Sequence, residues 1–206
     1  MPTFVDTVHT HFDLRIRTLA GIKARSLGAD NLTLTALKVL IYAQLEGGIK
    51  DLASCVLNDV NALRLPFGRI NPAILLWRNP NEIDRLKAMV DFNMIALANP
   101  FTAALNIPFQ LRSINRKYEL NQMSSDAVLK VYTGFGLDPA EVIKLKTKID
   151  EIVEDRNQAA HYGVLPRLST GLMEQHIRDN VMVVENLLTD FSIQLLPFFT
   201  DGMHLR

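Results

Sequence analysis

Apolar residues recur every three or four positions along four long stretches of the chain, the spacing of one buried face of an α-helix. These stretches run from Phe4 to about Arg25, from about Thr33 to Leu63, from about Pro139 to Gly163, and from Ser169 or Thr170 to about Phe198. A shorter helix is expected from Ser124 to about Thr133, where Ser-Ser-Asp supplies a start signal. The pattern therefore predicts an all-α fold, a bundle of four to five helices.

The second stretch is apolar on more than one side between Leu37 and Ile49, which is typical of the central helix of a bundle. Gly47 and Gly48 interrupt it, and each costs about 1 kcal/mol in a helix interior relative to alanine. We therefore expect another element to approach the helix closely at these two glycines.

The segment 64–123 does not keep this long helical pattern, because prolines and a glycine divide it into short apolar stretches: Pro66, Gly68, Pro72, Pro80, Pro100 and Pro108. Since proline interrupts helices, this segment is expected to be an insertion of loops and short helices within one domain spanning 1–206. Its basic cluster of Arg112, Arg116 and Lys117 could contact an RNA backbone, and a solvated polar face is the alternative.

The third long stretch has a clear start. Asp138 can cap the first free N–H groups, Pro139 fits the first turn, and Glu141 completes a capping box. The buried stripe that follows contains Val142, Leu145, Ile149, Ile152 and Val153, and its next members are Arg156 and Ala160.

Arg156 thus occupies a position where an apolar residue is expected. Burying an unpaired guanidinium costs on the order of several kcal/mol, so we expect a carboxylate partner, or a pocket or interface that receives an anion. Asn157 and His161 are four residues apart and share a helix face, whereas Arg156 and His161 point about 140° apart on a straight helix. One shared site therefore requires a bend near Ala159 or a seam between helices.

Composition narrows the function classes. The formal net charge is zero and the pI about 7, so any RNA contact must come from a local patch. The single Cys55 excludes an intramolecular disulfide framework, and neither a secretory signal pattern nor a membrane-length apolar run is visible, so we expect a soluble protein of the reducing cytoplasm.

Common catalytic motifs are missing from the sequence: there is no GxxxxGK[ST], GxGxxG, CxxC, HExxH or GxSxG pattern. This argues against phosphate-loop nucleotide hydrolysis, zinc chemistry and α/β-hydrolase catalysis. An arginine, by contrast, offers a planar fork of donors for a phosphate, and a histidine can transfer a proton at neutral pH.

Residues 149–161, IDEIVEDRNQAAH, resemble the signature of the HEPN superfamily, in which Arg, a polar residue and a spacer precede His. Two further stretches are similar to one HEPN branch: LIYAQLEGGIKDL at 40–52 and SSDAVLKVYTGFGLDPAEV at 124–142. A His four to six residues after an Arg is expected roughly once by chance in this chain, so the weight of the motif comes from its context. The resemblance covers the middle and C-terminal half well and the segment 63–123 poorly.

The resemblance implies a metal-independent endoribonuclease without a cofactor, acting as a toxin or antiviral defence effector. It implies that Arg156 binds the scissile phosphate, that His161 is the acid or base, and that Asn157 positions the substrate or His161. Cleavage by the 2′-hydroxyl of RNA needs one base and one acid, so two copies related by a two-fold axis would form one composite site. An antitoxin or other regulatory protein is a further expected partner. Related toxins often have Tyr two residues after His, whereas Tyr162 follows directly here, which puts regulation through that tyrosine in doubt.

A second reading is a catalytically silent helical dimer that serves as an interaction or nucleotide-sensing module. In that reading Arg156 and His161 are interface residues. A purely structural alternative is that Arg156 pairs with Glu46 or Glu154 and that His161 caps the helix end. Glu46 could instead orient Arg156 or His161, or extend to solvent at a helix edge. The acidic residues Asp150, Glu151, Glu154 and Asp155 would repel RNA unless they point away from the motif.

Overall fold

The computed structural model describes residues 4–63, 122–163 and 170–200 of the chain. This part of the chain contains five helices: α1 (Phe4–Arg25), α2 (Asn31–Ala62), α7 (Ser125–Phe135), α8 (Ala140–Tyr162) and α9 (Thr170–Thr200). The predicted all-α class is confirmed, and each helix predicted outside 64–123 is present. None of the described helices combines the length and apolarity that crossing a membrane requires.

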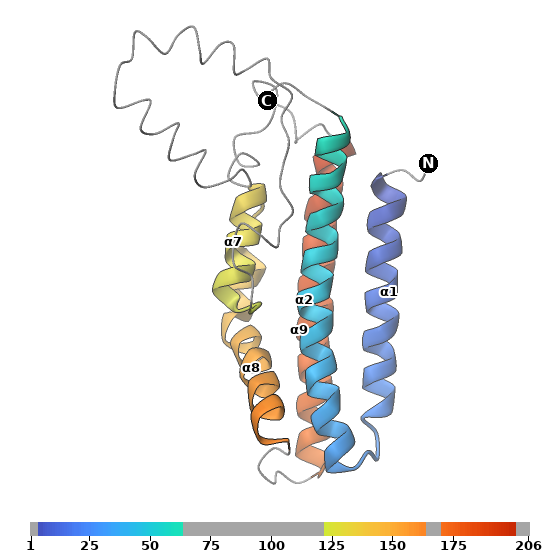
Figure 1. Ribbon diagram of the computed structural model, residues 1–206, viewed down its shortest axis with the longest axis vertical. Helices are drawn as coiled ribbons and strands as arrows, with labels where there is room; N and C mark the ends of the chain where they lie inside the picture. The colour runs from blue at the N-terminus through green and yellow to red at the C-terminus, as the bar shows by residue number, and fades with distance from the viewer. Residues whose placement is uncertain (1–3, 64–121, 164–169, 201–206) are drawn as a thin grey trace, which may run out of the picture.

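The two longest helices, α2 and α9, lie side by side at the centre of the bundle (Figure 1). α1 packs against both of them on one side, and α8 packs against both on the other. α7 contacts α8 and reaches α9, where the Tyr132 hydroxyl donates a hydrogen bond to the Leu187 carbonyl at 3.2 Å. The expected central role of α2 is confirmed, because three other helices pack against it.

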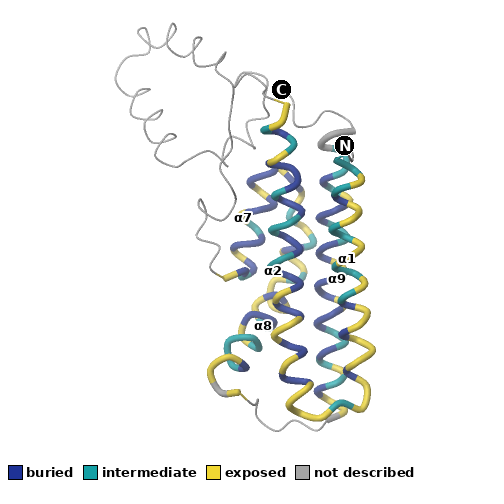
Figure 2. Tube along the Cα trace, turned by 45° about the vertical axis from the view of Figure 1, so that its right-hand side comes forward, coloured by how far each residue is buried: buried dark blue, intermediate teal, exposed yellow. Residues whose placement is uncertain are grey.

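The core follows the apolar stripes read from the sequence. Along α9 one apolar stripe with helical spacing is completely buried: Ile177, Val181, Val184, Leu188, Phe191 and Leu195. Buried positions face inward on every helix in Figure 2. The rings of Tyr132 and Phe135 on α7 lie 5.0 and 6.4 Å from the ring of Phe191, so the short helix closes one end of this core.

The helix starts depend on local capping. The Asp30 carboxylate accepts the Thr33 N–H at 2.7 Å, and the Ser124 hydroxyl accepts the Ala127 N–H at 3.3 Å. Each satisfies a backbone donor that the first helical turn leaves free. α2 therefore begins at Asn31, two residues before the predicted start at Thr33.

The glycine pair in α2 lies where other side chains approach its backbone. A Cβ atom on Gly48 would lie 2.6 Å from Leu188 Cδ2 of α9, and one on Gly47 would lie 2.7 Å from Arg15 Nη2 of α1. The predicted close approach is confirmed. At Gly47, however, a guanidinium occupies the space where a side chain would lie.

The insertion predicted over 64–123 lies almost wholly outside the described residues, as do Arg112, Arg116 and Lys117. Met123 is described, is fully buried, and donates its N–H to the Tyr42 hydroxyl at 3.0 Å. The chain thus enters α7 from a point anchored on α2.

Candidate functional site

The start of α8 differs in detail from the prediction. The Asp138 carboxylate accepts the Ala140 N–H at 3.0 Å, so Asp138 does satisfy a backbone donor. Pro139 is the N-cap residue and makes no side-chain capping bond. Glu141 pairs with Lys144 at 3.1 Å, so the predicted capping box is wrong: the carboxylate finds a cation one turn later.

The buried stripe of α8 leads to Arg156 as expected. Val142, Ile149, Ile152 and Val153 are buried, and Arg156, one turn after Ile152, is half-buried. The stripe then continues through Ala159, which is buried, and Ala160 is exposed. The assignment of Ala160 was wrong because a step of seven residues from Ile152 holds the same helix face, and this step reaches residue 159.

Arg156 rests on an aromatic ring. Its guanidinium carbon lies 5.0 Å from the centre of the Tyr42 ring on α2, within the range of a cation–π contact. Its Nη1 donates to the side-chain oxygen of Asn157 at 3.0 Å. Within the described residues Arg156 forms no ion pair with a carboxylate, so of the two expectations for this buried position, the one that leaves an anion site open agrees with the geometry.

Tyr42 is a fixed platform for that guanidinium. Its side chain is 3% exposed, and its hydroxyl is anchored by the Met123 N–H. Burial raises the pKa of the Tyr42 phenol; the nearby Glu46 carboxylate raises it further, while the Met123 hydrogen bond and the Arg156 charge act in the opposite direction. The ring is therefore neutral at physiological pH.

Glu46 reaches the site only through Tyr42. Its carboxylate forms an ion pair with Lys50 one turn along α2, and its negative charge acts on the Tyr42 hydroxyl. Among the residues that the structure describes, Glu46 forms no ion pair with Arg156. Glu154 accepts a hydrogen bond from Gln158 at 2.9 Å, so neither carboxylate considered as a partner for Arg156 is paired with it.

The other acidic residues beside the motif also have partners. Asp150 accepts the Ser125 N–H at 2.9 Å and the Ser125 hydroxyl at 2.8 Å, which ties α8 to the first turn of α7. Glu151 pairs with Lys148 at 2.6 Å on the outer surface of α8. These contacts hold the acidic groups on other faces of the helix than the one that carries Arg156.

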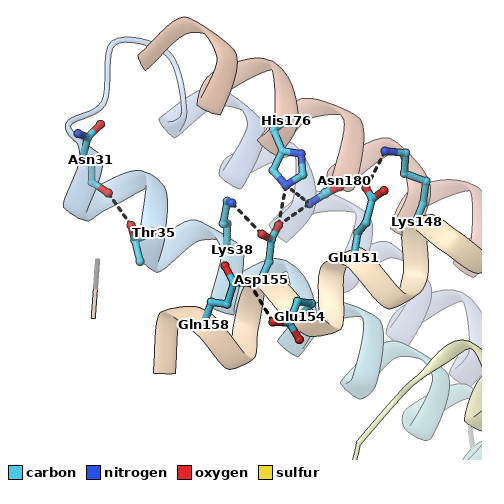
Figure 3. A network of polar contacts seen from close by, with 10 residues as sticks. All are labelled: Asn31, Thr35, Lys38, Lys148, Glu151, Glu154, Asp155, Gln158, His176 and Asn180. Carbon is cyan, nitrogen blue, oxygen red and sulfur yellow. Dashed lines mark hydrogen bonds and ion pairs between the residues drawn. The ribbon is translucent and has the colours of Figure 1, made fainter. Parts of the chain in front are cut away.

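Asp155 is the centre of a buried polar cluster that the sequence analysis did not find (Figure 3). Lys38 Nζ of α2 lies 2.9 Å from Asp155 Oδ1, and His176 Nε2 of α9 lies 2.6 Å from Oδ2. The amide of Asn180, also on α9, donates to Oδ2 at 3.2 Å. We call Lys38, Asp155, His176 and Asn180 the Asp155 cluster.

The cluster keeps Asp155 ionised inside the bundle. Burial would raise the pKa of Asp155, but the hydrogen bonds from His176 and Lys38 and the charge of Lys38 outweigh it, so the pKa lies below its ordinary value. The sequence contained one signal for this cluster: Lys38 interrupts the apolar face between Leu37 and Ile41, so a buried cation needed an acidic partner.

His161 lies in the last turn of α8 and is exposed. Gly163 ends the helix with φ of 70° while its N–H donates to the Ala159 carbonyl at 3.1 Å, so the predicted end of the helix is confirmed. Tyr162 is the final residue of α8, and its side chain lies outside the described part. Within one protomer, Arg156 faces α2 from a half-buried position and His161 stands at the exposed helix end.

Comparison with known proteins identifies the fold family. Neither the curated proteins nor the solved structures contain a match to this chain. A family model described as RiboL-PSP-HEPN matches residues 20–196, which include α2, α7, α8 and nearly all of α9. The chain therefore belongs to the RiboL-PSP-HEPN family and has a HEPN-type fold.

Proposed function

We propose that this protein is a metal-independent endoribonuclease of HEPN type. The observation that carries the proposal is the state of Arg156: half-buried, stacked on Tyr42, and without an ionic partner in the described part of the chain. A half-buried guanidinium in this state favours binding of an anion. Its forked donors match the oxygens of a phosphodiester and the added negative charge of the transition state.

The proposed reaction begins with attack of the RNA 2′-hydroxyl on the adjacent phosphorus. A base removes the proton from that hydroxyl, the bond to the 5′-oxygen breaks, and an acid protonates the departing oxygen. The products are a 2′,3′-cyclic phosphate and a free 5′-hydroxyl. We assign the proton transfers to His161 and the phosphate contact to Arg156, with Asn157 holding the guanidinium through its amide oxygen.

A symmetric homodimer would supply the second histidine. A stripe of α2 supports this arrangement, because it is apolar yet exposed: Leu32 is 67% exposed, Val39 38% and Leu40 42%, and Ala36 and Ala43 are also exposed. Val39 is one turn before Tyr42, so the stripe borders the ring that carries Arg156. A second copy packed on this face would bury apolar surface and come next to the guanidinium.

The biological role that we propose is that of a toxin or defence effector in the cytoplasm, held inactive by an antitoxin or other regulatory protein. An enzyme that cuts RNA without a metal or cofactor needs external control, because its substrate is always present. Arg112, Arg116 and Lys117 stay candidates for additional contacts with the RNA backbone.

The experiment compares cleavage of RNA in excess chelator by the native protein, by His161→Ala, and by His9→Ala as a matched control. His9 is an exposed histidine on α1. We expect cleavage by the native protein and His9→Ala, with 2′,3′-cyclic phosphate ends, and at least about 100-fold less by His161→Ala. Equal cleavage by the native protein and both variants would contradict the proposal. RNA binding without cleavage by the native protein would also contradict it, and would favour an interaction or sensing module.

A further inference from the structure

We infer that Asp155 is a positioning residue, which uses Lys38, His176 and Asn180 to set the orientation of Arg156. The inference rests on the proposed function for its catalytic consequence. Its structural part concerns only how the guanidinium is held, so the two can be tested separately.

The first argument is that the cluster fixes α8 at one point from two directions. Asp155 uses one carboxylate oxygen for α2 and the other for α9, and its side chain is only 15% exposed. Lys38 is 4% exposed, so solvent does not compete for this contact. The carboxylate therefore restrains both the rotation and the sliding of α8 directly before Arg156.

The second argument is the register between α8 and α2. Lys38 and Tyr42 are one turn apart on the same face of α2. Consecutive residues of α8 meet them: Asp155 contacts Lys38, and Arg156 lies over Tyr42. A rotation of α8 that breaks the first contact must also move the guanidinium across the ring.

The third argument is that apolar residues would hold the helices together at least as well. A buried ion pair is a poor source of stability compared with apolar side chains of the same volume, because both charges lose their hydration. The cluster is also imperfect: Asn180 Oδ1 is buried and has no hydrogen-bond partner among the residues that the structure describes. Charged hydrogen bonds have a preferred geometry, so they fix the rotation of α8. That rotation determines where Arg156 points.

The test separates orientation from stability. The double variant Lys38→Met with Asp155→Leu replaces the ion pair by apolar side chains of similar size. We expect a lower thermal unfolding midpoint, because His176 and Asn180 lose the carboxylate that they contact. At a temperature where both proteins are folded, we expect a kcat for RNA cleavage about 10- to 100-fold lower. The matched control is Lys148→Met with Glu151→Leu, which removes an exposed ion pair from the same helix and should leave kcat unchanged.

A second readout needs no RNA. The side-chain Nε–Hε signal of Arg156 in an NMR spectrum, assigned by its loss in Arg156→Lys, should carry a ring-current shift from Tyr42 in the native protein. In the double variant we expect that shift to shrink. An unchanged signal would overturn the inference. A folded double variant with native kcat would also overturn it, provided that the native protein cleaves RNA.

If the native protein does not cleave RNA, the proposed function fails and the NMR result alone decides whether Asp155 positions Arg156. If the double variant does not fold, Asp155→Asn preserves the side-chain volume and takes its place in both measurements. A native Arg156 signal in folded Asp155→Asn would then reject the inference.

Discussion

Two arginines approach the central helix α2 from opposite sides, and their surroundings differ. Arg15 of α1 donates from Nη2 to Asp51 at 2.6 Å and from Nη1 to Gln44 at 3.1 Å. Arg156 of α8 lies over the Tyr42 ring, and its described hydrogen bond goes to the neutral amide of Asn157. Both guanidinium groups are partly buried, but within the described ranges of the chain Arg15 contacts a carboxylate and Arg156 does not.

The difference shows what distinguishes a structural arginine from a candidate for ligand binding. Partial burial alone does not distinguish them, because both arginines are partly buried. Arg15 is neutralised by Asp51 and packs over Gly47, so an additional anion would have to displace an existing partner. At Arg156 a neutral ring supports the charge without neutralising it, and no carboxylate of the described residues contacts the guanidinium.

The largest effect should come from removing the two arginines in turn. We expect Arg156→Met to lower RNA cleavage by about 100- to 1,000-fold, because one charged donor to the transition state is lost. Arg15→Met should lower the stability of the fold and leave kcat within a few-fold of native, measured at a temperature where both variants are folded. A similar loss of kcat in both variants would show that the contrast between the two arginines has no functional meaning.

A smaller effect is expected where Arg15 crosses α2. Alanine at exposed, unobstructed Gly21 should stabilise the protein by about 1 kcal/mol through helix propensity. Gly47→Ala should fall short of that value by about 1 to 2 kcal/mol, because the new methyl group displaces Arg15 from Asp51. Denaturant unfolding of the two variants measures the difference, and equal stabilisation would mean that Arg15 moves aside freely.

The smallest effect is expected on the stability of the fold at acidic pH. Because the folded-state pKa of Asp155 lies below its unfolded value, the ionised group contributes stability above the unfolded pKa of about 3.9. That contribution is lost as the pH falls through the folded pKa. In urea titrations between about pH 2 and 5 we expect the Lys38→Met, Asp155→Leu variant to lose less stability on acidification than the native protein. An identical pH dependence would assign the acid sensitivity to other carboxylates.

The sequence sufficed for the helices because the evidence for them is local. Spacing of apolar residues located the four long helices, the Ser-Ser-Asp start signal located α7, and Gly163 marked the end of α8 where the structure has it. The same spacing also identified Arg156 as an anomaly, since a guanidinium on a buried stripe is visible without any knowledge of neighbouring helices. Whether Arg156, Asn157 and His161 carry catalysis stays a prediction.

The contacts between helices could not be obtained in this way. The Asp155 cluster joins three helices, and Lys38 lies 117 residues before Asp155 in the chain, so no spacing rule connects its members. The capping box at Glu141 failed for the same reason: the Asp138 N–H that it requires is donated to Gln194 of α9 at 2.8 Å, a contact between helices. Glu46 likewise had several partners within reach, and the structure pairs it with Lys50.

The Tyr42 hydroxyl joins two otherwise separate parts of the molecule. The Tyr42 hydroxyl oxygen accepts a hydrogen bond from the Met123 N–H, and the Tyr42 ring makes the cation–π contact with Arg156. This hydrogen bond therefore connects the residue before the N-cap of α7 to the ring on which Arg156 lies. Tyr42→Phe would keep the ring under Arg156 and remove the hydrogen bond to Met123. This single atom therefore separates the two contacts experimentally.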